Sequence, residues 1–251
     1  VKYPAIYNHL LQFKDKLEKR GQCQGSLETI DKPFKGQHHW LELDNNPSED
    51  YLKVFLRPKI MYQRFQTKPC FIYDEDGLFC NDSMWIIPTS NKGLLAVLNS
   101  KMGWWLITKY CTQIQNGYQL IWNYFKQIPI PNNCSILSEQ AAKMHELNYL
   151  LQVQKNKFQS RIKSNFAIEK ISTKLETFYE HDFKTFVAEL KKQKVTLTLK
   201  QQDEWEEYFN DYKKEINELQ AEIEKTDKEI DQMVYELYGL SEEEIRIVEG
   251  K

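Results

Sequence analysis

The feature that most constrains this chain is a run of apolar residues near its end. Its members follow at alternating steps of four and three, the spacing of a helix that packs along another helix. Thr198 and Gln201 predict a capping box at the start, and Gly239 predicts the end. We expect one helix of about 50 Å, at 1.5 Å per residue. The apolar seam comprises Trp205, Phe209, Tyr212, Ile216, Leu219, Ile223, Thr226, Ile230, Met233 and Leu237.

A partner for this seam precedes it in the chain. Residues 138–164 carry apolar side chains at helical spacing, with Ser138 as the expected N-cap, and a further helix is expected over roughly 175–192. We favour an antiparallel hairpin within one chain, and hence a monomer, acting as a spacer or clamp. The alternative is a dimer formed through the seam.

The first half of the chain has a different pattern. Residues 55–88 predict two or three short strands, interrupted by Pro58, Pro69 and the turn at 74–77. Residues 93–110 predict a mostly buried helix on that sheet, and residues 1–20 a linker helix. The predicted class is α+β, with a small mixed or antiparallel sheet and a packed helix over residues 1–132. An all-α antiparallel hairpin with a coiled-coil seam follows over 133–251.

Charge is distributed unevenly between these halves. Residues 1–131 carry 16 Lys and Arg against 12 Asp and Glu, a net +4, and residues 132–251 carry 18 against 24, a net −6. A nucleic-acid surface therefore belongs on the first half. Cations interleaved with aromatic rings suit contacts to phosphates and base edges; the alternative is an ordinary sheet with solvated cations. The candidates are Arg57, Lys59, Tyr62, Arg64, Lys68 and Lys101.

A second group of candidates lies in residues 111–119. Asn116-Gly117 predicts a turn, and the amides of Gln113, Gln115 and Asn116 gather around it together with Tyr118. Asn and Gln side chains pair bidentately with adenine. We expect this segment to probe base edges, with a strand over 120–125 behind it. The alternative is a polar hairpin loop facing water.

The serial order of motifs carries a resemblance. It runs through Arg57-Pro58-Lys59-Ile60, Phe71-Ile72-Tyr73-Asp74 with Gly77, and Trp85-Ile86-Ile87-Pro88, and continues in residues 94–101, 128–131 and 230–240. This order resembles the C-terminal target-recognition domain of adenine-specific DNA methyltransferases, in particular TaqI-like and type IIG restriction-modification enzymes. The resemblance implies recognition of double-stranded DNA and places the start of the domain near Trp40 and Leu43, both in its core.

Catalytic signatures are missing from the sequence. There is no Gly-rich cosubstrate loop and no N/D-P-P-Y/F motif. We therefore expect no catalysis, no metal and no cofactor in this chain. By resemblance, S-adenosylmethionine would be used by an upstream methyltransferase domain of the same protein, which methylates adenine N6 with or without DNA cleavage. The start at Val1 rather than Met favours a piece of a longer protein.

Cellular context follows from composition and resemblance. The five cysteines are odd in number and lack a C-x-x-C pair, which favours reduced thiols. No apolar run approaches about 20 residues, so we expect no membrane span. By resemblance, we expect the protein in the cytoplasm of a bacterium or an archaeon. Two other functions stay open: a free-standing type I-like specificity subunit, and a coiled-coil interaction module without DNA binding.

Overall fold

The computed structural model describes residues 2–25, 33–42 and 47–250. The chain forms two compact units, Val1–Leu56 and Arg57–Lys251. The boundary predicted after residue 132, between the recognition domain and the helical arm, stays a prediction. Among the described residues, no helix is both long and apolar enough to cross a membrane.

The described residues of the first unit form short helices and turns. The helix expected over 1–20 is interrupted around residues 12 and 13. Trp40 is buried, and the Arg20 guanidinium donates to its carbonyl oxygen at 3.2 Å. Leu43 lies outside the described residues. The elements are α1 (Pro4–Leu11), α2 (Lys14–Leu17), a 3-10 turn (Gly21–Cys23) and α3 (Glu49–Phe55).

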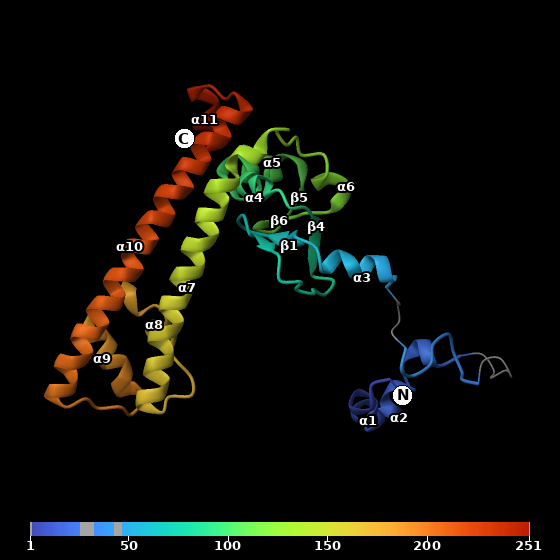
Figure 1. Ribbon diagram of the computed structural model, residues 1–251, viewed down its shortest axis with the longest axis horizontal. Helices are drawn as coiled ribbons and strands as arrows, with labels where there is room; N and C mark the ends of the chain where they lie inside the picture. Colours follow the sequence, from blue (N-terminus) through green and yellow to red (C-terminus); the bar gives the residue numbers. More distant parts are fainter. Residues whose placement is uncertain (1, 26–32, 43–46, 251) are drawn as a thin grey trace. The chain divides into compact units, whose positions relative to one another are not determined.

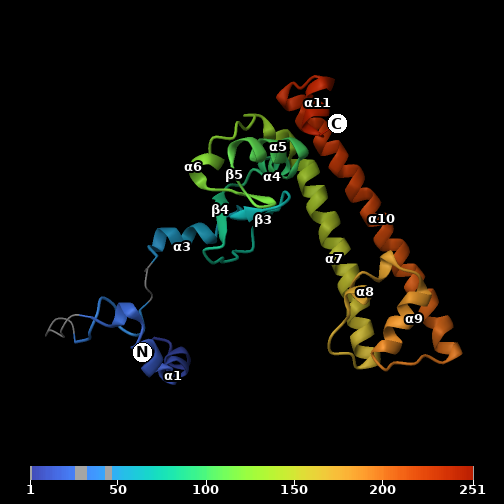
Figure 2. The same ribbon diagram turned by 180° about the vertical axis from the view of Figure 1, so that it is seen from behind.

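The second unit begins with two small antiparallel sheets (Figures 1 and 2). In the first, β1 (Lys59–Gln63) lies between β3 (Phe71–Asp74) and β4 (Met84–Pro88). In the second, β6 (Gly117–Gln119) lies between β2 (Phe65–Gln66) and β5 (Thr112–Ile114). The strands begin after Pro58 and Pro69 as predicted, because proline cannot donate to the ladder.

Two helices replace the single helix predicted over 93–110. They are α4 (Lys92–Asn99) and α5 (Lys101–Tyr110). At Ser100 the backbone turns to ψ 163°, and the Ser100 hydroxyl caps α5 by accepting from the Gly103 N–H. A Cβ on Gly103 would lie 2.1 Å from the Val97 carbonyl oxygen, so only glycine permits this close turn.

Residues 120–125 form no strand, contrary to our prediction. After Leu120 the chain makes the short helix α6 (Trp122–Phe125), whose Phe125 ring packs 5.1 Å from Tyr62 and 5.9 Å from Phe71. A short apolar run is compatible with a strand or with a buried helical turn, and here packing against the first sheet selects the turn.

The remainder is the helical arm. The predicted antiparallel hairpin is confirmed: α7 and α10 pack on each other, and every predicted seam residue is buried or half-buried. The helix expected over 175–192 is instead broken, because Asp182 caps a new helix by accepting from the Thr185 N–H. The elements are α7 (Ser138–Phe166), α8 (Thr173–Glu176), α9 (Phe183–Lys192), α10 (Leu199–Tyr238) and α11 (Glu242–Val248), with 3-10 turns at Cys134–Leu137 and Phe178–Glu180.

Two hydrophobic cores organise this unit. The first joins the sheets, α4 and α5 to the C-terminal end of α10, through residues such as Ile60, Leu120 and Val234. The second lies at the far end of the arm, where α7 and α10 spread apart and α8 and α9 lie between them (Figure 1). The arm is thus built into the core beside the sheets at one end and carries its own core at the other. The α+β class is confirmed.

Candidate nucleic-acid interface

Arg64 lies at the corner where one strand passes from the first sheet to the second. Its N–H donates to the Ser83 carbonyl oxygen at 3.1 Å, and its own carbonyl oxygen accepts from the Leu120 N–H at 2.8 Å. These bonds tie the Arg64 backbone to the first sheet on one side and to the second on the other. The exposed side chain therefore starts from a rigid position.

The guanidinium of Arg64 is oriented by Gln119. With the Gln119 amide oxygen facing it, Arg64 donates through Nη2 at 3.0 Å and through Nε at 3.1 Å. Since a guanidinium has five N–H groups, donors remain for a ligand. Phe65, Thr112 and Gln119 share one face of the second sheet, because Phe65 and Thr112 are both paired with Gln119.

A shallow pocket opens at this corner. It has a volume of about 440 Å³ and is lined by Gln63, Arg64, Phe65, Asp82, Ser83 and Gln119. Arginine pairs with guanine, glutamine with adenine, and a carboxylate accepts from the amino group of cytosine. The donor and acceptor set at the corner therefore suits the edges of bases.

The hairpin of β5 and β6 carries the predicted amides. Ile114 pairs with Gly117, so Gln115 and Asn116 form the two-residue turn, one residue earlier than the predicted Asn116-Gly117. Gln115 has φ +52°, a strained conformation for a side-chain residue. Gly117 is required for packing, since its Cβ would lie 2.6 Å from the Gln66 carbonyl oxygen. Gln115 and Asn116 are exposed at the tip.

Gln113 and Tyr118 lie on the opposite face of this sheet. Gln113 and Tyr118 are paired directly across β5 and β6, next to the pair of Thr112 and Gln119. Because successive residues of a strand point to opposite faces, their side chains lie on the other face from Gln119. Tyr118 is half-buried, and its ring meets Trp104 of α5 edge-on at 5.6 Å. Tyr118 thus anchors the hairpin to the core, while Gln113 is exposed on the face away from Arg64.

Two of the predicted DNA contacts, Lys59 and Tyr62, are buried, which corrects our expectation that they meet DNA. Lys59 is fully buried and forms an ion pair with Asp74, whose side chain is 2% exposed. Tyr62 is 1% exposed and packs between Phe71 and Phe125. The sequence pattern could not separate Lys59 from its exposed neighbours, because the deciding partner, Asp74, comes from another strand.

Lys101 is engaged within the protein. Its backbone N–H donates to Asp231 Oδ1 at 2.9 Å, and its ammonium lies 3.2 Å from Asp231 Oδ2 and 3.0 Å from Glu249 Oε1. The hydrogen bond to Glu249, followed by that to Asp231, raises the pKa of Lys101 above its ordinary value. Lys101 therefore fastens α5 to α10 and α11 rather than presenting an uncompensated charge.

The two remaining cations are exposed but lie apart. Arg57 precedes β1, and Lys68 follows β2, beyond the other end of β1. Seven residues of extended chain separate Arg57 from Arg64, which is roughly 23 Å. Only Arg64 and Lys68 adjoin the same end of the sheet. The predicted row of four cations is therefore not formed, because Lys59 is buried and Arg57 lies at the opposite end of β1.

Sequence reasoning missed Gln63, Ser83 and Gln119. Gln119 belongs to the polar segment 111–119, in which the predicted base contacts are Gln113, Gln115, Asn116 and Tyr118. The available signal was its alternation with Tyr118, since neighbours in a strand point to opposite faces. Ser83 gave no such signal, because the bond from the Arg64 N–H to its carbonyl oxygen joins segments distant in the sequence.

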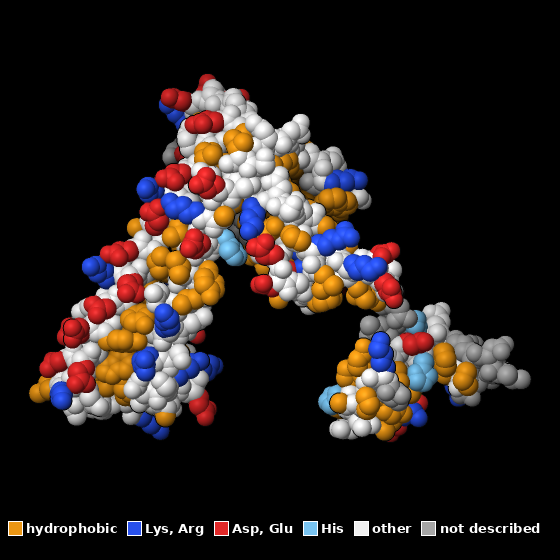
Figure 3. All heavy atoms as spheres, viewed as in Figure 1, with side chains coloured by type: hydrophobic (Ala, Val, Ile, Leu, Met, Phe, Trp, Pro, Cys, Tyr) orange, Lys and Arg blue, Asp and Glu red, His pale blue; other side chains and the backbone are white. Residues whose placement is uncertain are grey.

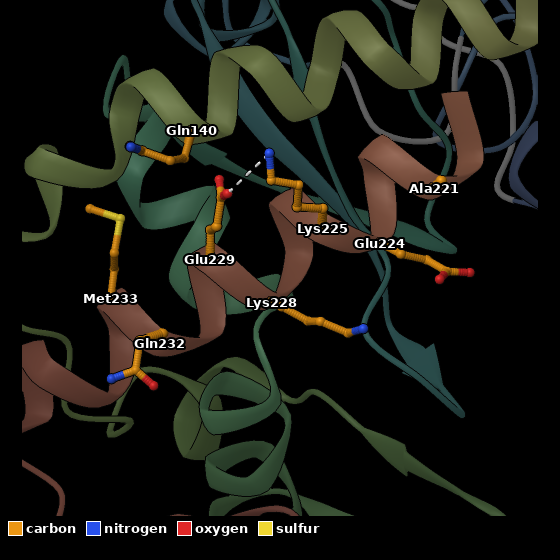
Figure 4. A pocket seen from close by; sticks show the side chains of 8 residues that line it. All are labelled: Gln140, Ala221, Glu224, Lys225, Lys228, Glu229, Gln232 and Met233. Carbon is orange, nitrogen blue, oxygen red and sulfur yellow. Dashed lines mark ion pairs between the residues drawn. The ribbon is translucent and has the colours of Figure 1, made fainter. Parts of the chain in front are cut away.

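A second depression lies on the arm, between α7 and α10 (Figure 4). It has a volume of about 670 Å³, and Lys225 and Glu229 form an ion pair of 3.9 Å at its edge. Glu224 and Lys228 point away from Gln140, so the polar groups do not converge as they do around Arg64. We do not regard it as a binding site. In the described part of the chain, no group of three or more His, Cys, Asp or Glu could hold a metal ion.

Comparison with known protein families divides the chain between residues 130 and 131. Residues 131–234 match a domain family of unknown function (DUF8810). No curated protein matches the chain significantly. Residues 14–130 match the TaqI-like C-terminal specificity domain. The resemblance predicted from the order of motifs is therefore confirmed, and this part of the chain is similar to the TaqI-like specificity domains.

Proposed function

We propose that this chain is the module through which an adenine-N6 DNA methyltransferase of the type II or IIG kind recognises its target in double-stranded DNA. The match to a TaqI-like specificity domain supports recognition of a DNA sequence for a methyltransferase. The finer assignment to adenine N6 rests on the motif order. An upstream domain would bind S-adenosylmethionine and hold the flipped base.

The observation that carries the proposal is the pair of Arg64 and Gln119 at the corner between the sheets. Both groups suit base edges, and the guanidinium is held at 3.0 Å by an amide rather than by a carboxylate. Preorganised donors lose less entropy on binding than flexible ones. The exposed amides at the hairpin tip, Gln115 and Asn116, extend this chemistry to a neighbouring base pair.

The coiled-coil alternative finds less support. A dimer through the seam would need apolar residues left uncovered on α10, whereas Phe209, Ile216 and Ile230 are buried within the chain. The acidic surface of α10 repels DNA along this helix. We therefore assign sequence recognition to the sheets and support to the arm.

Selection from a randomised pool of duplexes tests the proposal. The full chain should enrich one family of sequences, and Arg64→Ala or Asn116→Ala should relax the preference at one base pair by about 1–3 kcal/mol. Lys228→Ala, an equal loss of charge on the exposed surface of α10, should leave the preference unchanged. Failure to enrich any sequence, or preferences identical in all variants, would refute the assignment.

A further inference from the structure

Most of the acidic charge of the arm lies on α10. Within α10, 5 Lys and Arg stand against 13 Asp and Glu, a net −8. Residues 155–197, which we call the distal cap, carry 10 against 5, a net +5. The cap comprises the end of α7 with α8, α9 and their connecting loops. In Figure 3, Lys and Arg side chains gather over this end, and Asp and Glu follow α10.

Two of the five carboxylates in the cap are committed to its own structure. Glu189 is buried, accepting from Lys192 at 2.6 Å and from the Ser172 hydroxyl at 3.3 Å. Asp182 accepts from the Thr185 N–H at the start of α9. The hydrogen bonds from Lys192 and Thr185 hold the pKa of these two carboxyls below their ordinary values. Lys192 and Glu189 compensate each other, so the remaining residues of the cap keep its net charge of +5.

The positions of the cations are not explained by helix stability alone. Lys191 in the last turn of α9 complements the helix dipole, but Lys184 lies in its first turn, where a positive charge is unfavourable. Seven residues apart, they share one stripe of the helix, about 10 Å long. Both are exposed, as is Lys157 on α7. Within the described chain, no carboxylate lies at ion-pair distance from these three.

The cap is also a rigid platform. Phe158 stacks on Phe178 at 3.7 Å, and Phe186 packs 5.3 Å from Phe209 of α10. This separate aromatic core fixes α9 against the arm. Residues 155–166 of α7 lie 17 to 28 residues after Ser138, so this part of the cap is about 25 to 42 Å from the α4 end. In duplex DNA that range corresponds to roughly 7 to 12 base pairs.

We propose that the distal cap is a second contact to double-stranded DNA, which binds the phosphate backbone outside the recognised sequence. Lysine ammonium groups on a fixed surface neutralise phosphates without reading bases. The acidic α10 repels the duplex and so limits the contact to the end of the arm. This inference rests on the proposed function, because it requires that the same protein bind duplex DNA through its sheets.

Titration of salt against DNA affinity tests the cap. The variant Lys157→Ala/Lys184→Ala/Lys191→Ala is compared with the control Lys200→Ala/Lys225→Ala/Lys228→Ala, which removes the same charge from α10. Binding of the full chain to a 40-base-pair duplex containing the selected sequence is followed by fluorescence anisotropy. Each phosphate contact contributes about 0.9 to the slope of log affinity against log salt. The cap variant should therefore lower the slope by roughly 2 to 3, and the control should not.

The outcomes separate the two proposals. A cap variant that behaves like the control while the chain still selects its sequence refutes the cap contact alone. If the wild-type chain selects no DNA sequence, the proposed function is refuted instead. A cap variant that weakens binding to polyglutamate, but not to the duplex, would assign the surface to an acidic protein and also overturn the inference. Circular dichroism of both triple variants checks that they fold.

Discussion

Replacing Lys59 with methionine should destabilise the protein without altering how it binds DNA. The Lys59 and Asp74 side chains are 0% and 2% exposed, so methionine leaves a buried carboxylate without its cation. Removal of one partner from a buried ion pair costs about 3–5 kcal/mol. For a chain of this size, the midpoint of thermal unfolding should fall by roughly 6 to 20 °C.

The pair can be examined by a double-mutant cycle. Asp74→Asn retains an acceptor for the Leu78 N–H, which donates to Asp74 at 3.1 Å, but removes the charge. The double variant Lys59→Met/Asp74→Asn removes both charges together. It should be more stable than the sum of the single losses predicts, with a coupling of about 1–3 kcal/mol. Urea denaturation followed by tryptophan fluorescence measures the three differences.

The stabilisation by the Lys59–Asp74 pair should decrease as the pH falls. Burial raises the pKa of Asp74, but the hydrogen bonds from Lys59 and the Leu78 N–H outweigh it and hold the pKa below its ordinary value. The stability from this carboxylate is thus present above the unfolded pKa of about 3.9 and is lost as the pH falls through the folded pKa. The difference in the free energy of unfolding between wild type and Lys59→Met should therefore become smaller in acid.

DNA binding provides the discriminating measurement. If Lys59 contacted phosphate, Lys59→Met would flatten the salt dependence of binding at temperatures where the protein is folded. We expect an unchanged salt slope and a lower unfolding midpoint. Unfolding midpoints that agree within error, or single losses that add fully in the double variant, would refute the buried pair.

The remaining predictions concern packing and domain organisation. Gly117→Ala should lower the unfolding midpoint, because the new Cβ would lie 2.6 Å from the Gln66 carbonyl oxygen; an unchanged midpoint would contradict this close approach. Asp231→Ala should cost about 1–3 kcal/mol in urea denaturation, since it leaves the Lys101 N–H without its buried acceptor. A cost below 0.5 kcal/mol would argue against that role. Residues 57–251 produced alone should give a cooperative unfolding transition, as expected of a compact unit, and its absence would show dependence on the first unit.

Much of the architecture could be predicted because local chemistry specifies it. The seam from Trp205 to Leu237 predicted α10, and its capping box at Thr198 is formed as expected. Proline positions predicted where strands begin. Such signals depend on spacing and on backbone hydrogen bonds within a few residues, so they persist whatever the rest of the chain does.

The site depended on contacts between distant segments. Lys59 and Arg64 are both cations in or beside one strand, yet Asp74 draws one into the interior and Gln119 orients the other at the surface. Lys101 and Asp231 are 130 residues apart in the chain. The sequence by itself determined the long helix α10, the strand starts after Pro58 and Pro69, and where charge and amides accumulate. Only the tertiary structure decided which of those side chains meet solvent, because burial and pairing are properties of the assembled core.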